Sequence, residues 1–294
     1  MYRKILIVAI ATLLFSSRLC AQNQGAGFLL PDIPQTITDT KERANYLALH
    51  YWDKLDMAKQ AAVESDATNQ AFADFISILP HTTNRSEAFA ALWRRSYPHR
   101  DAFYHLLSLA ENYLYNVASP LRNEEHYIEA LEAVKGDKTI ADIDKLAATS
   151  QLELLKKNRV GSIATDFVFV DKSGTEQRLS EHGAEYVLLL FASADCEECK
   201  RMKRDIDANT RLWMMLRRGT LAIVAITLTP DQSAWDAVTC PERWISGWDK
   251  SQEIESKLLY DLTTKPRLYL LDKNRRILLK NTTPTQVDTF LSAQ

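Results

Sequence analysis

A run of apolar residues at 186–192 leads within a few residues to two cysteines, Cys196 and Cys199, and a helical pattern follows them. Such a run is typical of a buried strand. Two cysteines three positions apart at the first turn of a helix have the spacing of a short disulfide, and the helix N-terminus favours a thiolate. The order of strand, cysteine pair and helix therefore predicts an α/β domain and points to thiol-disulfide chemistry.

The N-terminus has the pattern of a secretory signal peptide over residues 1–21. Two basic residues precede an apolar stretch at 5–15, which is too short to span a bilayer comfortably. Cys20 is a candidate lipid acceptor, but Arg18 and Leu19 are poor residues before a lipidated cysteine, so simple secretion is the preferred interpretation. Either route predicts an exported protein of the periplasm or cell envelope, where disulfides persist.

Helical spacing of apolar residues dominates from about residue 39 to 157. Pro80, Pro98 and Gly136 interrupt the pattern at points where helices end. The last helix of the series is expected from 140 to 155. We therefore predict an all-α helical domain over residues 22–158.

Strands and longer crossovers replace this pattern over residues 159–294. A second apolar strand at 221–227 is separated from the first by one predicted helix, which runs to about Leu216. Two apolar strands joined through a helix imply a parallel pair, and a closing hairpin at 266–271 and 277–279 adds antiparallel strands. The predicted fold class is α+β with two domains, the second an α/β domain with a mixed central sheet.

Acidic and basic residues are nearly balanced, 38 against 36, and the chain has no nucleic-acid-binding footprint. Beyond the predicted signal peptide the cysteines are Cys196, Cys199 and Cys240, too few for a disulfide scaffold. A zinc site needs four ligands, and only Cys240 and His182 are left in this half, at no useful spacing. We expect no metal and no organic cofactor, so the redox-active group would be the cysteine pair.

Four pieces of the C-terminal half carry a family resemblance. They are Ala164-Thr-Asp-Phe167, the hairpin around Gly174, the apolar strand into the cysteine pair, and Pro266 at the start of residues 266–272. With these pieces, residues 161–294 resemble the thioredoxin-fold domain of the TlpA/ResA group of thiol-disulfide reductases. The resemblance implies that Pro266 is a cis-proline, which keeps the backbone beside the dithiol shaped for a substrate strand.

The helical half carries a second resemblance, in residues 46–53, 113–115, 119–120 and 122–125. These segments are similar to a helical domain of unknown function that precedes thioredoxin-like domains in envelope proteins of Gram-negative bacteria. This resemblance brings no known chemistry with it. We interpret residues 122–125 first as a capped helix start, and a protein partner for the helical domain stays open.

Three residues depart from the thioredoxin pattern around the cysteine pair. Asp195 stands directly before the first cysteine, where thioredoxins usually have Trp. Leu190 occupies the place of the buried acid of thioredoxin, and Met202 the place of a Glu found in ResA-type proteins. The usual proton acceptor is therefore missing from both places, and the group that takes the proton from Cys199 stays open.

Cys196 is the candidate nucleophile, because the first cysteine of such a pair faces the free N–H groups of the first helical turn. Cys199 would then resolve the mixed disulfide. Glu197 and Glu198 place negative charge beside the thiolate and favour the disulfide, which makes the reduced form a better electron donor. Lys265, one residue before the proline, opposes this effect. With two carboxylates in the loop, a reductant is the preferred direction.

The leading functional hypothesis is an envelope thiol-disulfide oxidoreductase that reduces protein disulfides with electrons from an unidentified upstream donor. One alternative is a non-catalytic envelope binding protein that uses the thioredoxin fold as a scaffold. Another is a peroxiredoxin-like thiol peroxidase, because the segment at 164–167 is shared with that relative. The plainest interpretation of the cysteine pair is a structural disulfide that never turns over.

A lone cysteine and several aromatic residues follow the second apolar strand, and we interpret both as structural. Cys240 is interpreted as a lone, partly buried thiol. The aromatic residues of this stretch are Trp235, Trp244, Trp248 and Tyr260. Packing is preferred for them over a ligand box, and they could also border the substrate groove.

Overall fold

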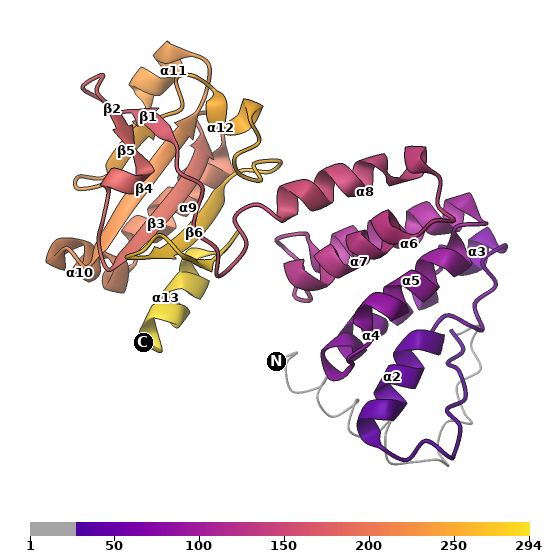
Figure 1. Cartoon of the computed structure of the whole chain (residues 1–294). Coiled ribbons are helices and arrows are strands. Elements are labelled where there is room, and N and C mark those ends of the chain that lie inside the picture. Colours follow the sequence, from indigo (N-terminus) through magenta and orange to yellow (C-terminus); the bar gives the residue numbers. More distant parts are fainter. Residues whose placement is uncertain (1–27) are drawn as a thin grey trace. The chain divides into compact units, whose positions relative to one another are not determined.

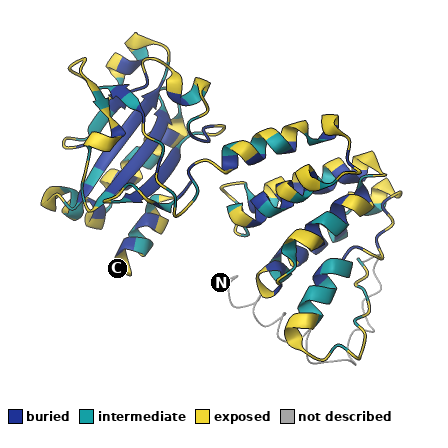
Figure 2. Ribbon diagram, in the orientation of Figure 1, coloured by how far each residue is buried: buried dark blue, intermediate teal, exposed yellow. Residues whose placement is uncertain are grey.

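The computed structural model describes residues 28–294, and the predicted signal peptide with Cys20 lies outside them. The chain separates into two compact units, Met1–Ala141 and Asp142–Gln294 (Figure 1). Each unit has its own buried residues (Figure 2). The predicted combination of a helical part and an α/β part with a mixed sheet is confirmed.

Helices make up the described part of the N-terminal unit. They are α2 (Thr40–His50), α3 (Gln60–Val63), α4 (Asp66–Ile78), the 3₁₀ turn η1 (Leu79–His81), α5 (Arg85–Ser96), α6 (Arg100–Leu114) and α7 (Glu124–Gly136). Asp39 and Asn123 cap α2 and α7, because each side chain accepts a backbone N–H of the first turn. Pro80 lies in η1, directly after α4, because proline has no N–H with which to continue the helix.

Aromatic side chains fill the core of the N-terminal unit. Trp52, Phe72, Phe75, Phe89 and Trp93 are each 2% exposed or less, and neighbouring ring centroids among them lie 5.6–6.2 Å apart. The indole N–H of Trp93 donates to a backbone carbonyl of α7 at 2.9 Å, so its burial leaves no donor unsatisfied. The helices are therefore held together mainly by apolar burial.

A seven-stranded sheet forms the centre of the C-terminal unit (Figure 1). Its strands are β1 (Val168–Val170), β2 (Glu176–Arg178), β3 (Tyr186–Ser193), β4 (Leu221–Leu228), β5 (Ile245–Trp248), β6 (Arg267–Asp272) and β7 (Ile277–Leu279). The strand order is β2-β1-β5-β4-β3-β6-β7. β3 is parallel to β4 and antiparallel to β6, as the sequence predicts.

Helices and one turn complete this unit. They are α8 (Asp142–Leu155), η2 (Leu179–Glu181), α9 (Glu197–Asp207), α10 (Thr210–Arg218), α11 (Gln232–Ala237), α12 (Glu253–Ser256) and α13 (Pro284–Ser292). Alternate residues of β3 enter two different apolar clusters, Leu189 and Phe191 in one, Leu188 and Leu190 in the other. Because both faces of this strand are covered, its sequence is a continuous run of apolar residues.

Two features of this unit differ from the prediction. The sequence predicts a single helix up to about Leu216, but the structure has two, α9 and α10. The second helix starts because the Asn209 side chain accepts the backbone N–H of Leu212 at 3.0 Å and caps α10. Strand β5 is not predicted, since its four residues contain Ser and Gly rather than an apolar run. Gly247 is needed there, because a Cβ would collide with the side chain of Phe169 on β1.

The C-terminal end of α8 and the residues after it are hydrogen-bonded to two loops of this unit. The ammonium of Lys280 donates to the carbonyls of Leu155 at 3.0 Å and Lys157 at 3.2 Å, where a cation suits the helix C-terminus. The Asn158 side chain donates to the carbonyl of Leu259 at 2.7 Å. Helix α8 accordingly belongs to the C-terminal unit, while the division predicted between residues 158 and 159 stays a prediction.

Candidate redox site

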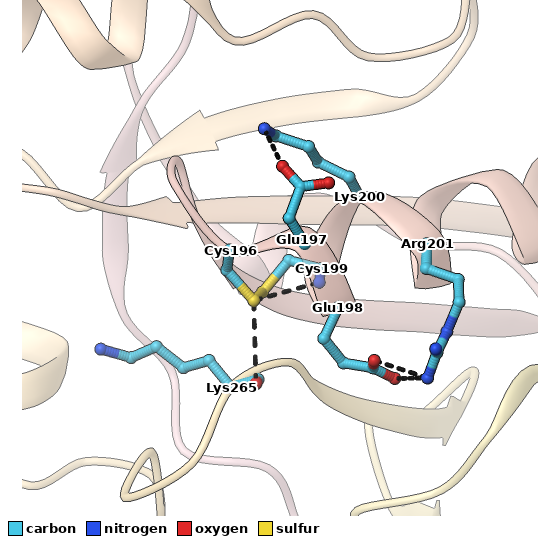
Figure 3. The surroundings of a disulfide bond; sticks show 7 residues. All are labelled: Cys196, Glu197, Glu198, Cys199, Lys200, Arg201 and Lys265. Atoms are coloured by element: carbon cyan, nitrogen blue, oxygen red, sulfur yellow. Dashed lines mark hydrogen bonds and ion pairs between the residues drawn. A yellow bond between two sulfur atoms is a disulfide. The ribbon is translucent and has the colours of Figure 1, made fainter.

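A disulfide joins Cys196 and Cys199 at the point where β3 passes into α9 (Figure 3). Cys196 is the N-cap of α9, and the two Cα atoms are 5.1 Å apart. The backbone N–H of Cys199 donates to Cys196 Sγ at 3.0 Å. This sulfur therefore occupies the place of a capping oxygen and faces the positive end of the helix.

The two sulfurs differ in their access to solvent. Cys196 is partly exposed, whereas Cys199 is 1% exposed and packs in an apolar cluster with Leu190 and Leu268. A partner disulfide can therefore reach Cys196 and not Cys199. The predicted order of attack fits this asymmetry, although the roles of both cysteines stay predictions.

The loop before β6 faces the disulfide. Phe191 of β3 pairs with Arg267 of β6, so the antiparallel register brings Pro266 to the end of β3 that leads to Cys196. The Lys265–Pro266 peptide bond is cis, as the resemblance implies. The carbonyl oxygen of Lys265 lies 3.8 Å from Cys196 Sγ, so the backbone of this loop borders the sulfur directly.

The charged side chains around the disulfide are paired with one another. Glu197 contacts Lys200 at 2.6 Å, and Glu198 contacts Arg201 (Figure 3). The nearby ammonium of Lys200 holds the pKa of the Glu197 carboxyl below its usual value. The ammonium of Lys265 points to Glu255 rather than to the sulfur. Glu197, Glu198 and Lys265 therefore each have a counter-charge, which weakens their effect on the cysteine pair.

The three departures from the thioredoxin pattern have distinct surroundings. Asp195 is exposed beside Cys196. Leu190 is fully buried in the cluster that holds Cys199, and Met202 packs against the same cluster. The two places where related proteins carry an acid are thus filled by apolar side chains, which leaves Cys199 in an apolar environment.

A buried ion pair behind the cis-proline loop is not predicted from the sequence. A guanidinium nitrogen of Arg267 lies 3.3 Å from a carboxylate oxygen of Asp261, and their side chains are 1% and 0% exposed. Arg267 also donates to the Thr263 hydroxyl at 3.2 Å. An arginine inside the apolar strand Arg267–Asp272 is the signal that indicates such a partner, because a buried charge needs one.

The aromatic residues 235–260 do not gather at one site. Trp235 and Trp248 stack with their centroids 6.1 Å apart, and Lys172 lies 3.7 Å above the Trp235 ring. Trp244 belongs to the Cys199 cluster, whereas Tyr260 packs on the opposite face against Phe191. All four side chains are buried, so they serve the packing of this unit and do not form a common ligand site.

The polar segment at residues 122–125 lies at the start of α7. Asn123 caps α7, and Arg122 contacts Glu124 at 3.5 Å, so this segment has the capped helix start that its sequence suggests.

Within residues 28–294, no three His, Cys, Asp or Glu side chains gather as they would around a metal ion. None of the helices in that range is both long and apolar enough to cross a membrane.

Parts of this chain are similar to known proteins. The profile of a domain of unknown function, DUF5106, matches residues 14–158. A conserved protein of unknown function from Bacteroides fragilis is 33% identical, with a TM-score of 0.44, over 45% of this chain and 98% of that one. The C-terminal domain of an uncharacterized protein from Bacteroides fragilis is also 33% identical, with a TM-score of 0.43, over 46% and 98% of the two chains. No curated protein matches the sequence.

Similarity over nearly the whole chain is seen with a solved structure. It is a thioredoxin-like protein from Bacteroides caccae, which is 32% identical with a TM-score of 0.78. The match covers 91% of this chain and 98% of that one, so both the helical part and the α/β part are included. With the DUF5106 match in its N-terminal half and a cysteine pair at the end of β3, the chain belongs to the thioredoxin-like proteins.

Proposed function

We propose that this protein is a thiol-disulfide oxidoreductase that reduces disulfides of other proteins through Cys196 and Cys199. The observation that carries the proposal is the unequal access of the two sulfurs: Cys196 is partly exposed at the N-terminus of α9, and Cys199 is buried behind it. A structural disulfide does not require one accessible sulfur facing a cis-proline loop. An exchange site does.

The reaction would proceed in two exchanges. In the reduced protein, the Cys196 thiolate attacks one sulfur of the substrate disulfide, a Cys196–substrate bond forms, and the substrate bond breaks. The departing thiolate takes up the proton that Cys196 lost on ionisation. Cys199 then attacks Cys196 Sγ, which closes the protein disulfide and releases the second substrate thiol. Two electrons and two protons pass from the cysteine pair to the substrate.

The apolar surroundings of Cys199 bear on the second exchange. Because Leu190 and Met202 fill the places of the usual acids, we assign the proton of Cys199 directly to the departing substrate sulfur. The balance then closes without a side-chain base. Regeneration of the dithiol requires an upstream dithiol donor, which we propose as a partner in the cell envelope.

We further propose the TlpA/ResA type for the C-terminal domain. The segment at 164–167 supports it, because Phe167 is buried in the core and the Tyr260 hydroxyl donates to the Thr165 carbonyl at 2.6 Å. Export to the periplasm or cell envelope follows from the predicted signal peptide, and it suits a protein whose cysteine pair forms a disulfide. The helical domain is proposed to bind a protein partner.

Insulin reduction tests the proposed function. The mature protein is equilibrated with dithiothreitol and compared with Cys196→Ser, and with Cys240→Ser as a matched thiol control. We expect Cys196→Ser to abolish the reduction, whereas Cys240→Ser, which retains both cysteines of the pair, should still reduce insulin. Unchanged activity in Cys196→Ser would rule out the dithiol mechanism. Absence of any redox change in the wild type would favour the binding protein, and peroxide consumption in the same preparation would favour the peroxidase.

A further inference from the structure

A pocket of about 620 Å³ lies beside the disulfide. One wall is α9, which contributes Lys200, Lys203 and Arg204. The other wall runs from α11 to Pro241 and is built of small and apolar side chains together with the Cys240 thiol. Asp195, the residue directly before Cys196, also lines the pocket, so the pocket adjoins the redox site.

The α9 wall carries two cations that are not held in an ion pair by any described residue. Lys200 is paired with Glu197 at 2.6 Å. Within residues 28–294, neither Lys203 nor Arg204 takes part in an ion pair. With Lys200 neutralised by Glu197, the remaining cations of this wall are Lys203 and Arg204, and the carboxylates of Asp195 and Asp207 line the same pocket. A ligand that places a carboxylate directly against Lys203 and Arg204 would therefore gain electrostatic energy.

The opposite wall sets a second requirement. It bears no charged side chain, and Ala234, Ala237 and Val238 present only small apolar groups. A ligand must therefore offer an apolar side chain to one wall and an acidic side chain to the other. An extended peptide does so naturally, because successive side chains of a strand point in opposite directions.

The position of the pocket relative to the disulfide suits a peptide that is already engaged there. In Figure 3, Lys200 and Lys265 lie on opposite sides of the two sulfurs. The Lys265–Pro266 loop borders Cys196 on one side, and the pocket begins at Asp195 and Lys200 on the other. A substrate whose disulfide reaches Cys196 from the loop side would place its flanking residues at the pocket.

We propose that this pocket binds an acidic and apolar segment that flanks the disulfide of a protein substrate. The acidic side chain lies against Lys203 and Arg204, and the apolar side chain lies against the wall that contains Cys240. The identity of the ligand as a substrate segment rests on the proposed function. Occupancy of the pocket does not, because a peptide without cysteine can bind to the oxidised protein.

Cys240 provides a local reporter for this binding. In the oxidised form it is the free cysteine of the described residues, and it is partly exposed in the pocket wall. The mature oxidised protein is treated with N-ethylmaleimide, an uncharged thiol reagent, and the labelling rate of Cys240 is followed by mass spectrometry. The probes are a cysteine-free peptide of alternating Glu and Leu, and the same peptide with Gln in place of Glu.

We expect the Glu peptide at saturation to slow the labelling of Cys240 several-fold and the Gln peptide to leave it unchanged. The apparent affinity should fall as salt is raised, because exposed charges are screened. The variant Lys203→Glu/Arg204→Glu should bind the Glu peptide at least about fivefold more weakly, the scale of an exposed ion pair. The matched variant Arg217→Glu/Arg218→Glu changes the net charge by the same amount, but on α10. In this variant the Glu peptide should still protect Cys240.

The proposal is overturned if the Gln peptide protects Cys240 as well as the Glu peptide, or if protection persists in Lys203→Glu/Arg204→Glu. Equal protection by sodium sulfate at the same ionic strength would also contradict a peptide site. In a second arm, kcat/KM for peptide disulfides with Glu flanks should exceed that for Gln flanks about fivefold, and the difference should vanish in the variant. Loss of all reduction with protection intact would refute the proposed function and leave the pocket assignment standing.

Discussion

The backbone N–H of Cys199 donates a hydrogen bond to Sγ of Cys196 across 3.0 Å, so the backbone of the buried cysteine stabilises the sulfur of the accessible one. A sulfur that accepts an N–H at a helix N-terminus is in a favourable place to carry negative charge. The same arrangement leaves Cys199 1% exposed among apolar side chains. The first turn of α9 therefore distinguishes the two cysteines both electrostatically and sterically.

This difference predicts the order of alkylation. In the reduced protein, iodoacetamide should modify Cys196 faster than Cys199 by a factor of about ten or more, because reaction needs an accessible thiolate. Peptide mapping by mass spectrometry after short exposures measures both rates. Cys240→Ser serves as the background, so that the third thiol does not consume reagent. Faster modification of Cys199 would contradict the assigned roles.

The paired carboxylates predict a small and directional effect on the redox potential. In Glu197→Gln/Glu198→Gln the potential should rise, because the lost negative charges favoured the disulfide. The rise should stay below the roughly 30 mV that corresponds to a tenfold change in the equilibrium constant, since Lys200 and Arg201 already compensate the acids.

Equilibration in glutathione buffers measures this shift. The matched variant Lys200→Gln/Arg201→Gln removes the two counter-charges and should lower the potential. A fall, or no change, in the Glu→Gln variant would show that these acids do not make the site more reducing.

The buried ion pair behind the cis-proline loop predicts a large loss of stability. Arg267→Met leaves the Asp261 carboxylate buried without its guanidinium, at a cost of about 3 to 5 kcal/mol in the free energy of unfolding. Arg267→Met/Asp261→Leu should recover part of this loss, because no isolated charge remains. Urea unfolding of the full chain measures both variants.

A surface ion pair offers the matched control. Arg211 contacts Asp288 at 2.9 Å, and their side chains are 43% and 37% exposed. Arg211→Met should therefore change the free energy of unfolding by about 1 kcal/mol or less. An Arg267→Met variant as stable as Arg211→Met would mean that the buried pair contributes nothing beyond a surface contact.

One buried and one half-buried histidine predict a pH dependence of stability. Desolvation lowers the pKa of His126, on α7, below its ordinary value of 6.5. Below pH 6.5 the unfolded chain therefore binds more protons than the folded one, and stability falls as the pH drops through this window. In His126→Gln, the melting temperature, followed by circular dichroism, should decline less on acidification than in the wild type.

His182 provides a comparison in the other unit. Burial lowers the pKa of this histidine too, so His182→Gln should also reduce the acid sensitivity. The two substitutions lie in separate units, and their effects should add. Identical pH profiles for the wild type and both variants would refute the assignment of this sensitivity to the histidines.

Strong local patterns made much of the fold predictable. Strands β3 and β4 are long apolar runs buried on both faces, and Pro80 and Asn123 mark helix boundaries through their own backbone and side-chain chemistry. Strand β5 is not predicted, because a short segment that contains Ser and Gly forms a strand only when neighbouring strands pair with it. The break between α9 and α10 depends on one capping side chain, Asn209.

The sequence by itself determined the cysteine pair, the strand that carries it and the proline that faces it. The cysteine pair and its strand are local features, and the place of Pro266 beside them follows from the resemblance to a thioredoxin fold. Only the tertiary structure decided which charges act on the pair: Glu197 is compensated by Lys200, and Lys265 turns to Glu255. It also placed Cys240 and the cations of α9 in one pocket. Side-chain partners and pockets depend on how segments distant in sequence pack, and spacing along the chain does not encode that.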